Sequence, residues 1–166
     1  MKKLKIALKA KRAYSWLLLL FPTLLILLLF LSKDKLNDYA AKAIRAEAGS
    51  QVIHSESVYI NSEYNYIKNG QNFQFTFLEF GAKGCSACNR MELVMNEMRE
   101  KYPGKVNVVF VNILLPKNQG LMKYYGIAAI PTQVLLNSDG LEYFRHIGFY
   151  STIELARKLE LFKKKY

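Results

Sequence analysis

The sequence has few residues that bind metals or haem: two cysteines and two histidines among 166 residues. A zinc site needs four ligands in a regular spacing, and neither His54 nor His146 falls near Cys85 and Cys88 in such a pattern. Covalent haem attachment requires a histidine directly after the second cysteine, where this chain has Asn89. We therefore expect no metal and no bound cofactor.

Acidic residues are missing from the start of the chain, and the first one is Asp34. Six of the 24 basic residues come before residue 13, namely Lys2, Lys3, Lys5, Lys9, Lys11 and Arg12. The rest of the chain has 18 basic and 13 acidic residues, so most of the net charge of +11 belongs to the N-terminal segment. No arginine-rich tract or basic patch interleaved with aromatic residues follows, so we expect no nucleic-acid partner.

Charged residues are also absent from Ala13 to Leu31, a run of 19 residues rich in leucine. About 20 apolar residues span the hydrocarbon core of a bilayer. A membrane helix tolerates Pro22, and Tyr14 and Trp16 are typical of the headgroup layer. We predict a cytoplasmic basic tail at residues 1–12 and a single transmembrane signal anchor at residues 13–32, with the rest of the chain exported.

A cleaved signal peptide is the alternative to an anchor, because it also has a basic start and an apolar middle. Its cleavage site needs small residues, and the chain after Leu31 reads Ser32, Lys33, Asp34. An uncleaved anchor is therefore favoured. Under both interpretations the chain after this segment is exported.

The remainder is predicted to be a juxtamembrane linker helix at residues 33–50 followed by one α/β domain at residues 51–166. Strand-type and helix-type patterns alternate in it, which indicates a central sheet covered by helices on both faces. The expected strands are Val52–Tyr59, Phe73–Phe80, Val106–Leu114, Thr132–Leu136 and Leu141–Ile147. The expected helices are Ser62–Lys68, Cys85–Tyr102 with a core stripe of methionines, Leu121–Tyr125, and a last helix begun by the capping box of Ser151 and Glu154.

The two cysteines lie two residues apart, after a predicted strand and at the start of a predicted helix. The unpaired N–H groups and positive dipole end of a helix N-terminus stabilise a thiolate. We expect Cys85 to be the exposed nucleophile and Cys88 the resolving thiol. A purely structural disulfide is the competing interpretation, but so short a loop gives little entropic stabilisation.

Phe77–Cys88 and Tyr125–Thr132 resemble two signature segments of the thioredoxin family, and the resemblance covers residues 51–166. Phe77–Cys88 is similar to the active-site strand and loop of the family, and Tyr125–Thr132 is similar to its second signature. The resemblance implies a thioredoxin-like fold in which Pro131 is cis and faces the sulfurs, while the Ile130 backbone pairs with substrate. It also implies that Gly148 keeps the substrate groove open. Without the cysteine motif, Pro131 would be an ordinary trans proline that starts a strand.

Glu79 matches the buried acid of the family, which is often glutamate in extracytoplasmic reductases of the cytochrome c maturation type. Such a carboxyl would have a raised pKa and accept the proton of Cys88. The alternative is a solvated strand carboxylate.

The chain departs from the family at several positions. Gly81 and Gly84 replace the flanking tryptophans, Phe110 replaces a lysine near the buried acid, and Ser86 and Ala87 replace Gly-Pro between the cysteines. These changes affect the redox potential and the substrate surface and leave the exchange chemistry intact.

The residues between the cysteines include no histidine of the kind that oxidases carry, so we expect a reductase of exported protein disulfides, with apocytochrome c as one candidate. Its electron donor would be a membrane-embedded dithiol carrier, and we expect the protein to be monomeric. A disulfide-donating oxidase or isomerase of the same fold and a non-catalytic binding module are the alternatives.

Overall fold

The computed structural model describes residues 20–165. The chain divides into two compact units, Met1–Tyr39 and Ala40–Tyr166. Residues 20–31 are helical, whereas residues 13–19 of the predicted anchor lie outside the described part. Within residues 20–165, no helix combines the length and the apolar character needed to cross a membrane.

Between residue 33 and the first strand the structure has three helices, where the sequence predicted two. A helix, α2 (Lys33–Glu47), occupies most of the segment predicted as the linker, and α3 (Gly49–Tyr64) and the short α4 (Tyr66–Asn69) follow it. The helix predicted at Ser62–Lys68 is therefore split between the end of α3 and α4. The domain boundary at residue 51 stays a prediction.

The strand predicted at Val52–Tyr59 is wrong, because this segment lies inside α3. Its valines and aromatic residues favour strands by propensity. The side chains that turn inward are instead Ile53, Ile60 and Tyr64, which recur at helical spacing. Contact of α3 with α6 (Gln119–Tyr125) buries this face, so tertiary packing overrides the local preference.

The strands and helices predicted from Phe73 onward are confirmed, and four strands form a mixed sheet in the order β2-β1-β3-β4. The strands are β1 (Phe75–Gly81), β2 (Val106–Asn112), β3 (Thr132–Leu136) and β4 (Glu142–Ile147). β1 pairs parallel with β2 and antiparallel with β3, and β3 and β4 form the predicted hairpin. β1 is therefore a central strand, and all seven of its residues are buried.

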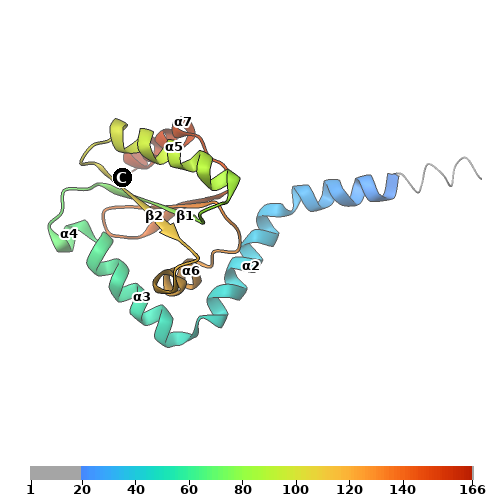
Figure 1. Cartoon of the computed structure of the whole chain (residues 1–166), viewed down its shortest axis with the longest axis horizontal. Coiled ribbons are helices and arrows are strands. Elements are labelled where there is room, and N and C mark those ends of the chain that lie inside the picture. Colours follow the sequence, from blue (N-terminus) through green and yellow to red (C-terminus); the bar gives the residue numbers. More distant parts are fainter. Residues whose placement is uncertain (1–19, 166) are drawn as a thin grey trace, which may run out of the picture. The chain divides into compact units, whose positions relative to one another are not determined.

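Helices cover both faces of this sheet, as the sequence predicted (Figure 1). On one face, Phe75 and Phe77 pack with the methionines of α5 (Ser86–Lys101) and with α7 (Thr152–Lys165). On the other face, Leu78 and Phe80 pack with α3 and α6. Alternate residues of β1 thus supply two separate cores, and its odd-numbered residues face α5.

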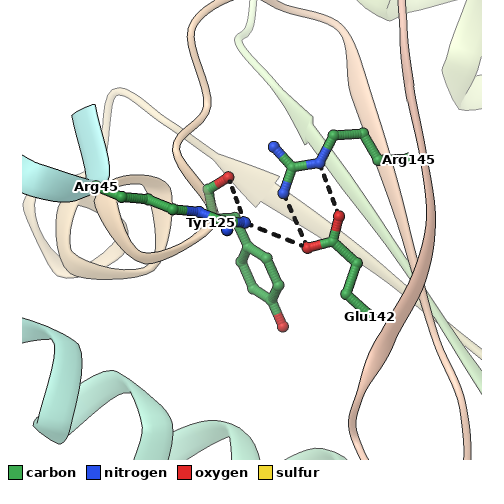
Figure 2. A network of polar contacts seen from close by, with 4 residues as sticks. All are labelled: Arg45, Tyr125, Glu142 and Arg145. Atoms are coloured by element: carbon green, nitrogen blue, oxygen red, sulfur yellow. Dashed lines mark hydrogen bonds and ion pairs between the residues drawn. The ribbon is translucent and has the colours of Figure 1, made fainter. Parts of the chain in front are cut away.

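The last turns of α2 belong to the packed domain. Figure 2 shows Arg45, whose guanidinium donates to the backbone carbonyl of Tyr125 at 3.3 Å and to the carboxylate of Glu142 at 3.5 Å. Arg145 binds the same carboxylate through two hydrogen bonds of 2.7 and 2.8 Å. Ala41 is buried beside this network and contacts the turn at Gly126.

Candidate active site

The two cysteines lie at the junction of β1 and α5. Cys85 is the N-cap residue of α5, and its Sγ accepts a hydrogen bond of 3.2 Å from the backbone N–H of Cys88. The two sulfurs are joined as a disulfide, with the Cα atoms 5.2 Å apart. The sulfur of Cys85 therefore occupies the anion-binding position at the start of a 16-residue helix.

The two cysteines differ in exposure, in the direction that the sequence predicted. Cys85 is half-buried, whereas Cys88 is only 3% exposed. A cavity of about 260 Å³ reaches Cys88 from the side and is lined by Lys83, Glu92, Arg99 and Phe110 among others. Cys85 is therefore the more accessible of the two cysteines.

Glu79 lies on the same face of the sheet as Cys88. It precedes Gly81 by two residues on β1, and a Cβ atom at Gly81 would be 3.4 Å from the sulfur of Cys88. The side chain of Glu79 is fully buried, which excludes the alternative of a solvated carboxylate. Burial raises the pKa of Glu79 to about 8, and a hydrogen bond from Gln133 opposes this rise.

Gln133 is a site residue that our sequence reasoning missed. It lies on β3 directly opposite Glu79, is fully buried, and its Nε2 donates to Oε2 of Glu79 at 3.1 Å. The available signal was a glutamine among the apolar residues of the predicted strand Thr132–Leu136. Only the register between β1 and β3 identifies its partner.

The second signature lies beside the end of β1. Thr132 pairs with Phe80, so Pro131 comes next to the point where the cysteine loop leaves the sheet. The Ile130–Pro131 peptide bond is cis. The backbone N–H of Gly148 donates to the carbonyl of Pro131 at 2.8 Å, which brings together two of the three residues assigned to substrate binding.

Two of the departures from the family pattern are physically linked. Phe110 lies opposite Glu79 on β2, and its Cε2 would be 2.9 Å from a Cβ atom at Gly81. A side chain at position 81 therefore fits only if Phe110 moves.

These groups suit reversible thiol-disulfide chemistry. The site offers an accessible sulfur, a second sulfur within bonding distance and a buried carboxyl whose pKa of about 8 is near that of an ordinary thiol, about 8.5. Within residues 20–165, no group of three or more histidines, cysteines or acids is arranged to hold a metal ion.

Comparisons with known proteins agree with this geometry. Thioredoxin from Haemophilus influenzae is 29% identical over 112 residues, which are 64% of this chain and 92% of that protein. Thioredoxin from Pseudomonas aeruginosa is 30% identical over 83 residues, 50% of this chain and 74% of that protein. The crystal structure of oxidised thioredoxin O2 from Arabidopsis thaliana shares the fold, with a TM-score of 0.51 at 20% identity, over 64% of this chain and 86% of that one.

The similarity to thioredoxins and the Cys85–Cys88 pair support thiol-disulfide oxidoreductase activity. The thioredoxin-like domain family matches residues 62–163, which include both cysteines, Glu79, Pro131 and Gly148. This chain belongs to the thioredoxin-like domain family.

Proposed function

We propose that this protein catalyses thiol-disulfide exchange, with Cys85 as nucleophile and Cys88 as resolving thiol. The supporting observation is the arrangement of the two sulfurs, in which the more exposed one caps a helix and the buried one lies on the same face of the sheet as the buried Glu79. A structural disulfide would not need this asymmetry in exposure or a buried acid.

The reduced protein acts in two steps. The thiolate of Cys85 attacks a substrate disulfide, forms a mixed disulfide and releases one substrate thiolate. Cys88 then loses its proton to Glu79, and its sulfur attacks Sγ of Cys85, which forms the Cys85–Cys88 disulfide and releases the second substrate thiolate. Two electrons pass from the protein to the substrate, and the proton on Glu79 later passes to solvent.

Substrate would bind beside Pro131 as an extended segment. The backbone of Ile130 offers hydrogen-bonding groups to such a segment, in the manner of strand addition. Gly148 has no side chain to fill the space next to Pro131. The bond between Gly148 and Pro131 supports this assignment because it fixes the two groups together.

We further propose that the protein works as a reductase on the outer side of a membrane, tethered by residues 13–32. The uncharged run and the six preceding basic residues support the tether. Disulfides of exported proteins, apocytochrome c among them, would be the substrates. Because cytoplasmic reductants do not reach that compartment, a membrane-embedded dithiol carrier would supply the electrons.

Reduction of insulin by dithiothreitol tests the chemistry. The protein should accelerate the reaction, and Cys85→Ala should abolish the acceleration. Cys88→Ala should instead trap mixed disulfides with substrates through Cys85. A wild-type rate equal to the uncatalysed rate would exclude catalysis and leave the alternative of a binding module.

The membrane tether and the direction of electron transfer need separate measurements. Full-length protein expressed in cells should sediment with membranes and resist alkaline extraction, and external protease should digest residues 51–166. Equilibration with glutathione gives the redox potential. A potential near that of strong oxidants, about −120 mV, would favour disulfide donation over reduction.

A further inference from the structure

Glu79 and Gln133 form a buried polar pair between two neighbouring strands of the sheet. They lie opposite one another on β1 and β3, both are fully buried, and Nε2 of Gln133 donates to Oε2 of Glu79 at 3.1 Å. Oε1 of Glu79 and Oε1 of Gln133 have no hydrogen-bond partner among the residues that the structure describes. Two buried and incompletely satisfied polar side chains are costly, so a purely structural role does not account for them.

Gln133 is the only polar contact to Glu79 that the described residues provide. The residue opposite Glu79 on β2 is Phe110, and α5 contributes Cys88, Met91 and Met95 to this face. Of these groups only Cys88 titrates, once it is reduced. Lys83, Glu92 and Arg99 line the cavity at Cys88, and none of them is a cause of the raised pKa of Glu79.

A neutral amide donor has a specific effect at such a site. It stabilises the ionised carboxylate less than a cation does, so Glu79 keeps a high proton affinity. It also occupies one carboxyl oxygen in both protonation states, because Oε2 accepts the bond whether or not a proton is present on Oε1. The proton is thereby assigned to one atom of the carboxyl group.

We propose that Gln133 is a positioning residue for proton transfer between Cys88 and Glu79: its amide holds Oε2, so that Oε1 is the oxygen that carries the proton. This inference rests on the proposed function, in which Cys88 loses its proton to Glu79. Gln133 itself touches neither the substrate nor the transferred proton. It acts through the orientation and proton affinity of Glu79.

The first test is a titration of the Glu79 carboxyl by ¹³C NMR in the oxidised protein. Gln133→Met keeps the volume and removes the donor, and Gln133→Leu serves as a second apolar variant if the first is unstable. Either should move the midpoint up by about one to two pH units, because a bond to the charged form is lost. An unchanged midpoint in a folded variant would overturn the proposal.

The matched control is Thr76→Val, which also removes a buried hydrogen bond on β1, that between Thr76 and Tyr66, without touching Glu79. It should leave the midpoint unchanged. An equal shift in this control would show that any loss of buried polarity has the same effect, and would overturn the proposal.

The second test is the pH profile of insulin reduction, in wild type and in Glu79→Gln. Gln133→Met should move the pH profile of insulin reduction to higher pH in the wild-type background. It should not move the profile in the Glu79→Gln background. An equal shift in both backgrounds would mean that Gln133 does not act through Glu79. The NMR midpoint does not depend on activity, so a protein without insulin reduction would refute the proposed function separately.

Discussion

The backbone N–H of Cys88 donates a hydrogen bond of 3.2 Å to the sulfur of Cys85. This bond ties the accessible sulfur to the first turn of α5, where a negative charge is most stable. Because the donor belongs to the backbone, its position depends on the helix rather than on a side chain. The difference in reactivity between the two cysteines should therefore follow from their places in one helical turn.

We expect the reduced protein to react with iodoacetamide at Cys85 at least about ten times faster than at Cys88 at neutral pH, because Cys85 is the more exposed of the two and its thiolate is stabilised. Peptide mapping after a short pulse measures the two rates. Unfolding in urea should abolish the difference. Preferential modification of Cys88 in the folded protein would contradict the assignment of the nucleophile.

Glu79→Gln should change the pH dependence of stability. The folded-state pKa of about 8 lies above the ordinary value of 4.5, so the folded protein keeps a proton that the unfolded chain releases. Wild type should lose stability as pH rises from about 5 to 8, by up to about 1.4 kcal/mol per pH unit, and Glu79→Gln should not. Urea unfolding of the oxidised proteins at a series of pH values measures the free energy of unfolding.

The control for that series is Glu100→Gln, which replaces an exposed acid on α5. Its stability should follow that of wild type across the pH range. Parallel curves for wild type and Glu79→Gln would show that Glu79 has no raised pKa in the folded protein.

Gly126→Ala should destabilise the domain more than Gly70→Ala. Both glycines cap helices with positive φ, +61° and +75°, so each substitution costs about 1–2 kcal/mol of backbone strain. At Gly126 the new Cβ would also collide with the backbone carbonyl of Ala41, whereas nothing lies near Gly70. The collision should add about 1–3 kcal/mol. Equal losses of stability in thermal unfolding of the two variants would show that Ala41 does not pack against Gly126.

Gly81→Ala should be destabilising, and Phe110→Leu should relieve part of the loss, because the new Cβ would lie 2.9 Å from Cε2 of Phe110. A double-mutant cycle of unfolding free energies should give a coupling of about 0.5–3 kcal/mol. Additive losses would mean that the two positions are independent.

The sequence by itself predicted the positions of the four strands, the methionine-lined core of α5 and the placement of the cysteine pair at a helix start. Strand and helix periodicity is a local property, and a Cys-x-x-Cys segment at a helix start places both sulfurs through covalent geometry. The burial of Glu79 and the place of Pro131 followed from a resemblance between motifs. Where local preference and packing disagreed, as at Val52–Tyr59, sequence reasoning failed.

Only the tertiary structure decided which side chains meet. Gln133 and Glu79 are 54 positions apart, and the register of β1 against β3 brings them together. The same is true of Gly81 with Phe110, and of Arg45 with Tyr125 and Glu142. Such contacts depend on strand order and register, which no single segment encodes, because they arise from the burial of several segments in one core.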